Sequence, residues 1–338
     1  MSRPRVLVVD DSAFARTVLS RILRVSNLVE VIGTARDGVD ALSKIEALDP
    51  DVITLDLTMP HLDGIGVLRA LAGRSRPRAI VVSISSVDTE LGAEALALGA
   101  VDLVAKPTAL ANERLAEIGE ELVAKILAIA TAAPATSAWP ATAELPSTTV
   151  ELVMIGTSTG GPQALTRLVS ALPATLRAPI CIALHIPEGY TQSLAARLDR
   201  MTELHVVEAS TGMVLEPGMV VLARGGAQLG VMRTGTRLVA EVSHDVRRMF
   251  APSVDELFET GVRAVGAGAL GVVMTGMGDD GLAGAHAIAA AGGSLITESA
   301  TSCIVYGMPR CVDEARLGAL SLPLDAIAGA IARAVNRS

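Results

Sequence analysis

Short aliphatic runs that alternate with helix-length segments constrain the fold of this chain more than any other feature. The first half of the chain contains five such runs: Val6–Val9, Val29–Ile32, Val52–Leu55, Ala79–Ile84 and Val101–Ala105. Runs of this length with amphipathic stretches between them are typical of βα units and a parallel sheet covered on both faces. From Val150 onward, apolar runs again end in loops rich in glycine and polar residues. We therefore expect an α/β protein in which functional residues lie at the carboxyl ends of parallel strands.

Charged residues follow three of the first five runs. Asp10 and Asp11 end the first run, Asp56 ends the third, and Lys106 and Pro107 follow the fifth. Carboxylates that converge at one sheet edge repel one another unless a cation lies among them, and oxygen ligands suit Mg²⁺. With the charge neutralised, one carboxylate could attack a phosphoryl donor and form an acyl phosphate. Each aspartate taken alone is more simply a helix cap or a solvated loop residue, so the prediction depends on the whole set.

The segments VLVVDDS, DVITLDLTMPHLDG and VAKP resemble the receiver domain of two-component response regulators. The resemblance implies a flavodoxin-like, five-stranded parallel receiver domain over residues 1–129, with Asp56 as the phosphoacceptor. The ligands that it implies for Mg²⁺ are Asp10, Asp11, Asp56 and the backbone carbonyl of Thr58.

The same resemblance implies two residues that respond to the phosphoryl group. Lys106 would pair with it, and a hydroxyl at the end of the fourth strand would follow it. We favour Ser85 for that hydroxyl. Ser83 remains the alternative, because the strand register is uncertain by about two residues. The fifth strand lacks the aromatic residue that such domains often carry, since Leu103 is the nearest large side chain.

A change of composition marks the joint between the two halves. Residues 110–129 have the periodicity of an amphipathic helix. The sequence TAAPATSAWPATAELPSTT then combines prolines, small residues and a single charge, and it includes Trp139. This composition predicts an exposed, semi-extended linker over residues 130–149.

The segment VMIGTSTGGP is the most prominent motif of the second half. An aliphatic run there ends in a tight, glycine-rich turn, and a helix-compatible run begins at Gln163. Such a turn lifts the hydroxyl of Ser158 above a sheet edge and points the following backbone N–H groups the same way. Taken alone, the motif is more simply a helix cap.

Two later loops supply the partners that a serine nucleophile needs. His185 directly follows the run Ile180–Leu184, and Asp280 follows Val272–Met274 in the loop TGMGDDG. Neutral imidazole is a suitable base near pH 7, and an aspartate on its far nitrogen fixes the tautomer and stabilises the imidazolium. The glycine-rich loop could also offer an oxyanion a backbone N–H, for which Met277 is our first choice.

Other arrangements compete with this triad. His286 is the main rival base, but it lies within an alanine-rich helix only six residues after Asp280. His61 belongs to the phosphoacceptor loop, whereas His205 and His244 lie in polar segments that we expect at the surface. The α/β-hydrolase elbow also contains GxSxG, but its order of serine, acid and histidine does not fit this chain.

The segments GTSTGGP, HIPEGYTQSLAARL, APSVDELF, TGMGDDG and YGMPR resemble the catalytic domain of the chemotaxis protein-glutamate methylesterases. The resemblance implies a doubly wound α/β catalytic domain over residues 150–338. Within it, Ser158 would be the nucleophile, His185 the base and Asp280 the orienting carboxylate. The residues that would border the site or polarise the ester are Thr157, Thr159 and Met277.

The two resemblances together imply a phosphorylation-regulated serine hydrolase that acts in chemotaxis. It would demethylate glutamate γ-methyl esters on the cytoplasmic helices of chemoreceptors and release methanol, with glutamine deamidation as a further activity. A chemotaxis histidine kinase would be the phosphodonor, and Mg²⁺ would be needed for phosphorylation but not for ester hydrolysis. We expect the unphosphorylated receiver domain to block large substrates.

Several residues depart from the methylesterase pattern. Leu184 stands where glutamine is usual, Asp279 where asparagine is common, and ARGGAQLG at 223–230 where a more polar loop is usual. Phe250 and Ala251 replace the usual histidine and arginine. One alternative function is therefore a non-catalytic, phosphorylated signalling adaptor with a degenerate esterase domain. A phosphate-binding second domain is the weaker alternative, because GTSTGG lacks a lysine or a full GxGxxG.

Charge and composition exclude several classes of function. The net charge of −8, without any basic block, argues against nucleic-acid binding. Cys181, Cys303 and Cys311 have no CxxC spacing, which argues against zinc and suits a reduced compartment. The uncharged stretches 126–143 and 264–278 fall short of the about 20 strongly apolar residues that a membrane span needs. The start of the chain is too short in apolar residues for a signal peptide. We therefore expect a soluble, cytoplasmic protein without membrane insertion.

Overall fold

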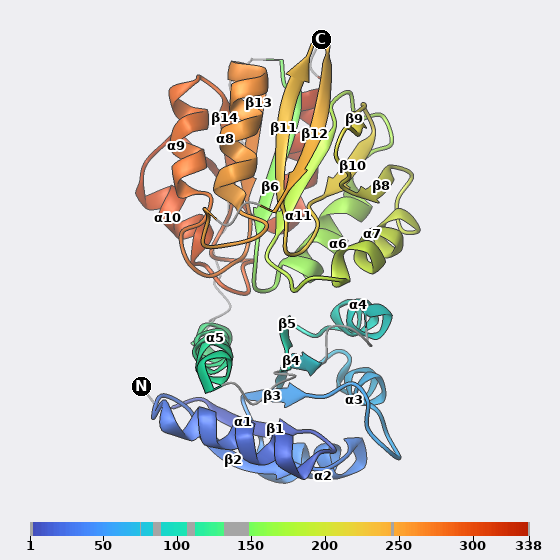
Figure 1. Cartoon of the computed structure of the whole chain (residues 1–338), viewed down its shortest axis with the longest axis vertical. Helices are drawn as coiled ribbons and strands as arrows, with labels where there is room; N and C mark the ends of the chain where they lie inside the picture. The colour runs from blue at the N-terminus through green and yellow to red at the C-terminus, as the bar shows by residue number, and fades with distance from the viewer. Residues whose placement is uncertain are drawn as a thin grey trace. The chain divides into compact units, whose positions relative to one another are not determined.

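The structure is a computed structural model that describes residues 3–74, 76–83, 89–106, 112–131, 149–244 and 247–336. The chain divides into two compact units, residues 1–132 and 133–338 (Figure 1). Most of the expected linker, including Trp139, lies outside the described residues. No helix in the described part of the chain is long and apolar enough to cross a membrane.

The first unit contains a parallel five-stranded sheet within its described residues. Its strands, in the order β2-β1-β3-β4-β5, are Glu30–Ala35, Arg5–Val9, Val52–Leu55, Arg78–Ser83 and Asp102–Ala105. All five strands overlap the aliphatic runs of the sequence, so the predicted receiver-type sheet is confirmed. The strand order reverses at β1 and β3, which places Asp10 and Asp56 side by side at the carboxyl edge.

Helices connect these strands: α1 Ala13–Val25, α2 Gly38–Leu48, α3 Gly64–Leu71, α4 Thr89–Ala97 and α5 Asn112–Thr131. Short polar side chains cap the first three, because Ser12, Asp37 and Asp63 each accept a hydrogen bond from an amide three residues on. At the start of α3, Gly64 lies so close to the sheet that a Cβ there would be 2.3 Å from the carbonyl oxygen of Asp56. This close approach holds the acidic loop against the sheet.

The second unit is built on a larger parallel sheet, which has seven strands in the described residues. In the order β15-β14-β13-β6-β7-β10-β8, these are Leu320–Leu322, Ser294–Glu298, Ala269–Val273, Leu152–Thr157, Ile180–Leu184, Met219–Leu222 and His205–Glu208. The chain adds β7 on one side of β6 and β13 on the other, so β6 lies at the switch point where ligands bind in open α/β sheets. The predicted doubly wound fold is confirmed.

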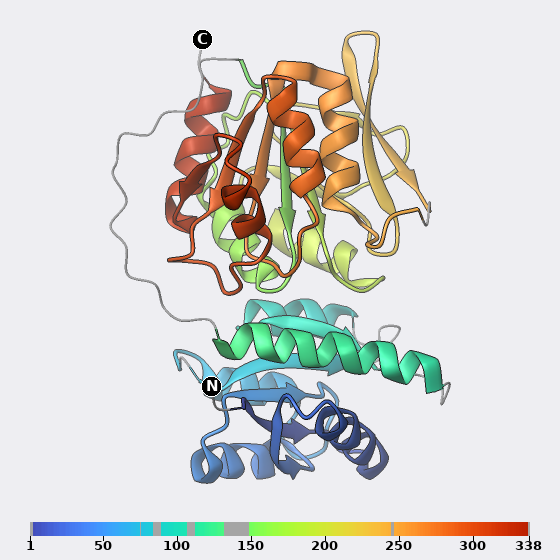
Figure 2. The same cartoon turned by 90° about the vertical axis from the view of Figure 1, so that its left-hand side faces the viewer.

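Helices cover both faces of this sheet: α6 Gly161–Ala171, α7 Tyr190–Asp199, α8 Val254–Val265, α9 Leu282–Ala290, α10 Met308–Glu314 and α11 Leu324–Val335. Figure 2 shows α8 and α9 on one face and α11 on the other. The core is aliphatic apart from a few large rings, among which Tyr190 and Phe258 are fully buried.

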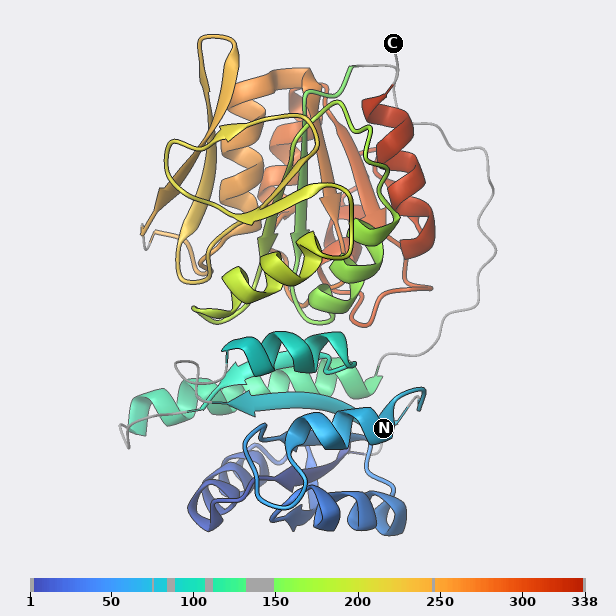
Figure 3. The ribbon, with the colours of Figure 1, turned by 90° about the vertical axis from the view of Figure 1, so that its right-hand side faces the viewer.

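Sequence analysis did not predict the small antiparallel sheet beside the main one. It consists of β9 Val214–Leu215, β11 Gln228–Thr234 and β12 Arg237–Ser243. Strands β11 and β12 form the long golden-orange hairpin at the upper left of Figure 3. Only Gly235 and Thr236 separate the two long strands. A two-residue loop with glycine between apolar runs is a hairpin signal, so the pattern was available in the sequence.

Candidate active site and acidic site

Ser158 lies immediately after β6, where the end of β13 holds it. Its backbone N–H donates to the carbonyl oxygen of Thr275 at 3.0 Å, and the hydroxyl of Thr157 donates to the same oxygen at 2.7 Å. Gly276 packs against the serine so closely that a Cβ there would lie 2.9 Å from the Cβ of Ser158. The turn continues through Gly160 at φ 81°, a left-handed conformation that favours glycine. The glycines thus let three chain segments meet around one serine.

His185 occupies the neighbouring position on the next strand. In the parallel pairing of β6 with β7, Thr157 lies opposite Leu184. The N–H of His185 then donates to the carbonyl oxygen of Thr157 at 3.1 Å. Ser158 and His185 are therefore the next residues on two adjacent strands, which run about 4.8 Å apart. The structure brings these two predicted residues to the same point of the sheet edge.

Asp280 lies against the imidazole of His185 and against the start of α8. Its Oδ2 is 2.8 Å from Nε2 of His185 and accepts the N–H of Val254 at 2.7 Å. Its Oδ1 accepts the hydroxyl of Ser253 and the N–H of Asp255, each at 3.0 Å. A carboxylate at a helix N-terminus satisfies unpaired amides and is stabilised by the helix dipole. The fold therefore fixes this carboxylate from the side opposite the histidine.

The electrostatics of the pair favour a charged carboxylate. Burial opposes ionisation of Asp280, but the hydrogen bond and charge of His185 and the amides of Asp255 and Val254 outweigh it, so the pKa of Asp280 is lowered. An ionised Asp280 accepts a hydrogen bond from Nε2–H of His185. The lone pair for base catalysis is then on Nδ1, the nitrogen that this contact leaves available.

A second carboxylate, that of Asp255, holds the start of α9 in the same way that Asp280 holds the start of α8. Asp255, in the first turn of α8, accepts hydrogen bonds from the amides of Gly281 and Gly284 at 2.9 and 2.7 Å, at the start of α9. Asp280 precedes α9 and caps α8, whereas Asp255 belongs to α8 and caps α9. The two helices thus hold each other's N-termini, and the loop between β13 and α9 cannot shift without breaking both caps.

The other predicted residues lie beside Ser158 or in the loop that packs against it. Thr157 and Thr159 are fully buried, and Met277 is partly exposed beside Gly276. The amide of Gly276 donates to the carbonyl oxygen of Val305 at 3.0 Å. Within the described residues, the amide of Met277 donates to no backbone carbonyl. This is the donor that sequence analysis preferred for an oxyanion.

The competing histidines lie elsewhere. His286 is exposed on α9, and His205 and His244 are exposed as well. Among the residues that depart from the family pattern, Asp279 is exposed, whereas Leu184 is fully buried. Neither of these two departures alters a contact of the His185–Asp280 pair.

Sequence analysis missed three residues that contact this pair directly or through one neighbour. Ser253, which lies in the segment APSVDELF but was given no role there, donates its hydroxyl to Asp280, as described above. The ring of Phe250 stacks on the imidazole of His185. Gln228, buried at the start of β11, donates to the carbonyl oxygen of Phe250 and accepts from the N–H of Ser253. The available signal was a glutamine that opens an apolar run, at a position where a buried polar group needs partners.

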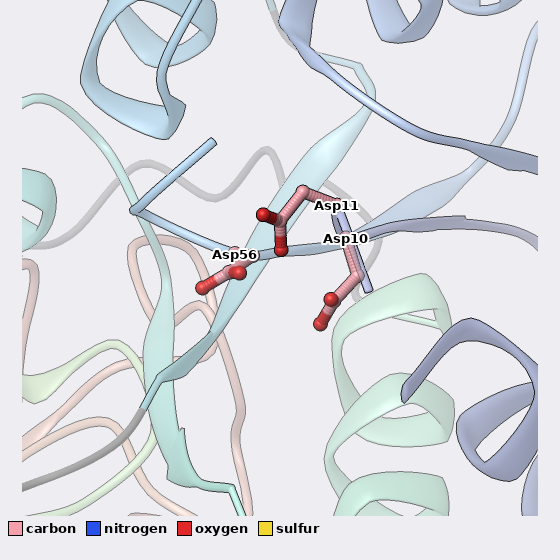
Figure 4. Close-up of side chains that lie close together, drawn as sticks. All are labelled: Asp10, Asp11 and Asp56. Atoms are coloured by element: carbon pink, nitrogen blue, oxygen red, sulfur yellow. The ribbon is translucent and has the colours of Figure 1, made fainter. Parts of the chain in front are cut away.

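The acidic residues of the first unit converge as the sequence predicts. Figure 4 shows Asp10, Asp11 and Asp56 together, and each offers a carboxylate oxygen within 4.8 Å of the others. Lys106 joins them, with Nζ 2.8 Å from Oδ2 of Asp10 and 2.7 Å from Oδ2 of Asp56. Asp10 and Asp56 are buried, whereas Asp11 is exposed.

The charges of this cluster are strongly coupled. Burial raises the pKa of Asp56, and the charge of Asp10 adds to this effect, while Lys106 and the amide of Thr58 act against it. Burial alone would lower the pKa of Lys106, but its two carboxylate partners outweigh burial and raise it. Three carboxylates with a single lysine leave an excess of negative charge, and an all-oxygen donor set is suited to a hard divalent cation.

The two candidate switch residues differ in what the structure describes. Ser85 and Pro107 lie outside the described residues. Ser83 is fully buried at the end of β4, and its carbonyl oxygen accepts the N–H of Lys106 at 2.7 Å. Thr58, the expected carbonyl ligand, lies exposed just after β3.

Both halves of the chain match known protein families. The family model described as CheB methylesterase matches residues 153–331, and that of the response regulator receiver domain matches residues 6–118. A Myxococcus xanthus protein named protein-glutamate methylesterase/protein-glutamine glutaminase 5 is 52% identical over 341 residues, or 98% of each chain. A Bacillus subtilis protein named protein-glutamate methylesterase/protein-glutamine glutaminase is 39% identical over 336 residues, or 93% of each chain. The crystal structure of the Thermotoga maritima CheB methylesterase catalytic domain has a TM-score of 0.53 and 34% identity, and the match covers 55% of this chain and 99% of that one.

Replacing the carboxylate of Asp280 tests whether this residue orients His185. We expect Asp280→Asn to slow labelling of Ser158 by a fluorophosphonate by roughly 10³–10⁴-fold, because the amide cannot fix the tautomer of His185 or stabilise its imidazolium. Asp279→Asn, a change at the exposed neighbour, should label at the wild-type rate. Equal rates for the two variants would refute the role of Asp280.

The same variant tests the pKa of Asp280 through stability. Because folding lowers this pKa, the ionised carboxylate stabilises the fold at pH values above its pKa in the unfolded chain, which is about 3.9. This stabilisation is lost as the pH falls through the pKa of the folded state. We therefore expect Asp280→Asn to lower the free energy of unfolding at pH 7 by about 1–3 kcal/mol. In calorimetric scans, the gap between the melting temperatures of wild type and variant should narrow below pH 4. A gap that stays constant down to pH 3 would contradict this assignment.

Gly276→Ala tests the close packing beside the serine. The new Cβ would lie 2.3 Å from Sδ of Met308 and 2.9 Å from Cβ of Ser158. We expect the loop to move away from Ser158 and the labelling rate to fall at least tenfold, since misplacement of about 1 Å can cost a factor of about 100. The control is Gly329→Ala on the exposed face of α11, which should keep full reactivity. Wild-type reactivity in Gly276→Ala would show that this packing does not position the serine.

Proposed function

Because the chain belongs to the CheB methylesterase family, we propose that it hydrolyses glutamate γ-methyl esters on the cytoplasmic helices of chemoreceptors and releases methanol. The observation that carries the proposal is the 2.8 Å contact between His185 Nε2 and Asp280 Oδ2. His185 directly follows β7, and Ser158 directly follows the neighbouring strand β6. This arrangement supplies a base, its orienting carboxylate and a hydroxyl at one sheet edge. Free cysteines at positions 181, 303 and 311 suit a cytoplasmic location.

The geometry supports a two-step acyl transfer. Oγ of Ser158 attacks the ester carbonyl while Nδ1 of His185 takes its proton, and the backbone N–H of Met277 stabilises the oxyanion. The tetrahedral intermediate collapses as the imidazolium returns the proton to the leaving methoxide, so methanol departs and a γ-glutamyl ester on Ser158 remains. Water then attacks this ester with His185 as base, and the product is a free glutamate carboxylate.

Deamidation of glutamine follows the same path with a different leaving group. Ser158 attacks the side-chain amide, and the amide nitrogen accepts the proton from His185 and departs as ammonia in place of methanol. The acyl-enzyme and its hydrolysis are unchanged. One site can thus serve both activities that the names of the relatives describe.

The first unit supports regulation by phosphorylation. A chemotaxis histidine kinase would be the phosphodonor for Asp56. Asp10, Asp11, Asp56 and the carbonyl of Thr58 would hold Mg²⁺, which supplies positive charge to the phosphoryl oxygens when bound. Lys106, which contacts both Asp10 and Asp56, would pair with the new phosphoryl group. The switch hydroxyl that follows would be Ser85 or Ser83.

Phosphorylation would then release the second unit from a restraint imposed by the first. The order of the units and the linker between them motivate this part of the proposal. A tenfold rise in the active population needs only about 1.4 kcal/mol, less than a few charge-assisted hydrogen bonds provide. A catalytically silent adaptor is disfavoured, because the His185–Asp280 pair and its helix caps are intact.

Methanol release from methylated receptor fragments tests the activity. We expect wild type to release methanol and Ser158→Ala to release none above background, because the nucleophile is absent. His286→Ala changes the exposed rival histidine and should keep wild-type release. Methanol release by Ser158→Ala at the wild-type rate would overturn the proposed nucleophile.

Acetyl phosphate with Mg²⁺ tests the regulation. We expect methanol release to rise several-fold for wild type and not to rise for Asp56→Asn, which lacks the attacking carboxylate. Chelation of Mg²⁺ should abolish the rise and leave basal release unchanged. Asp49→Asn, an exposed aspartate of the same unit, is the matched control and should respond as wild type does. Deleting residues 1–130 should raise basal activity, and unchanged or lower activity would contradict the restraint.

A further inference from the structure

We propose that Phe250, held in place by Gln228, is a positioning residue for the catalytic base His185. The inference rests on the proposed function, because it concerns the rate at which His185 activates Ser158. It assigns a role to two residues outside the triad, both in segments where the chain departs from the family pattern.

The contact between the rings is close and nearly parallel. The centroids of Phe250 and His185 lie 4.3 Å apart, and the ring planes differ by 14°. The hydrogen bond to Asp280 fixes Nε2 of the imidazole, and the backbone fixes its Cβ. The ring can still rotate about the line that joins these two atoms. A stacked ring on its face removes this freedom, because rotation of the imidazole would drive it into the phenyl ring. Phe250 and Asp280 together therefore define the plane in which Nδ1 points.

Phe250 itself lies in a short segment that Gln228 braces at both ends. Nε2 of Gln228 donates to the carbonyl oxygen of Phe250 at 2.6 Å, and Oε1 accepts the N–H of Ser253 at 2.8 Å. Between these points, the carbonyl oxygen of Ala251 accepts the N–H of Gly226 at 3.0 Å. Gln228 is only 3% exposed, so its two bonds have no competition from water.

The two hydrogen bonds of Gln228 hold the segment that carries both Phe250 and Ser253. One end of the segment carries Phe250, which covers the face of the imidazole, and the other end carries Ser253, which donates to Asp280. The turn before Gln228 also packs closely against the loop after His185. A Cβ at Gly225 in this turn would lie 2.7 Å from the carbonyl oxygen of Pro187. Residues 223–230, where the sequence departs from the family pattern, thus contact the segment before α8 and the loop after His185.

This role predicts a defect in catalysis rather than in substrate binding. If Phe250 only filled space at the surface, its removal would leave the reactivity of Ser158 unchanged. If it orients the base, its removal lowers kcat while KM stays constant, because the lost contact is with His185 and not with the substrate. A small probe that reacts with Ser158 should show the same loss, since its reaction also needs the oriented base.

The experiment compares full-length variants by the rate of fluorophosphonate labelling, kcat and KM for methanol release, and the downfield proton resonance of the His185–Asp280 hydrogen bond. We expect Phe250→Ala and Gln228→Ala to lose at least tenfold in labelling rate and kcat, with KM unchanged and the downfield resonance broadened or shifted. Phe250→Tyr, which keeps the ring, should recover at least half of the wild-type rate. Phe250→Leu keeps the apolar volume without a flat face and should remain impaired. Met249→Ala changes the neighbouring side chain, which is 92% exposed, and should behave as wild type.

The outcomes separate this inference from the proposed function. If wild type is labelled but Phe250→Ala and Phe250→Leu are labelled equally fast, the positioning role is wrong and the esterase proposal stands. An unchanged kcat with a raised KM in Phe250→Ala would likewise overturn positioning. If wild type is neither labelled nor releases methanol, the proposed function fails first.

Discussion

The buried carboxylate of Asp280 is the interaction on which the active site depends. It accepts hydrogen bonds from the Ser253 hydroxyl and two amides of α8, and it contacts Nε2 of His185. A buried charge is tolerated only when it is paired and fully hydrogen-bonded, and here the helix N-terminus and the imidazole meet that condition. Because the contacts also lower its pKa, Asp280 stays ionised at neutral pH and fixes the proton of His185 on Nε2. In the proposed mechanism, this one group decides which imidazole nitrogen acts as the base.

The parallel sheet supplies the rest of the geometry. Ser158 follows β6, His185 follows β7 and Asp280 lies in the loop after β13, so the three residues come from strands that are neighbours in the sheet but distant in sequence. Glycines allow the loops to approach one another, and the mutual capping of α8 and α9 stops them from separating. The acidic site of the first unit uses the same rule, with Asp10 after β1 and Asp56 after β3. The two proposed sites thus depend on the same property of parallel strands.

How much the sequence predicts depends on how a contact arises. Residues placed by strand ends, such as Ser158, His185, Asp56 and Lys106, were predicted because strand ends meet at one edge whatever the loops do. Phe250 was not, because its stack on His185 requires the exact path of the segment before α8, which Gln228 fixes from a hairpin that sequence analysis did not predict. Ser253 was not predicted either, because its bond to Asp280 depends on how α8 lies against the loop after β13. Such contacts between elements have no sequence period to reveal them.

The crystal structure of the full-length chain after reaction with a fluorophosphonate is the most direct test of the catalytic geometry. The account predicts phosphorus on Oγ of Ser158, a phosphonyl oxygen accepting the N–H of Met277, and Nδ1 of His185 within about 3.2 Å of the adduct. It also predicts that Nε2 of His185 still contacts Asp280. An adduct on another residue, or a His185 that faces away from both Ser158 and Asp280, would contradict it.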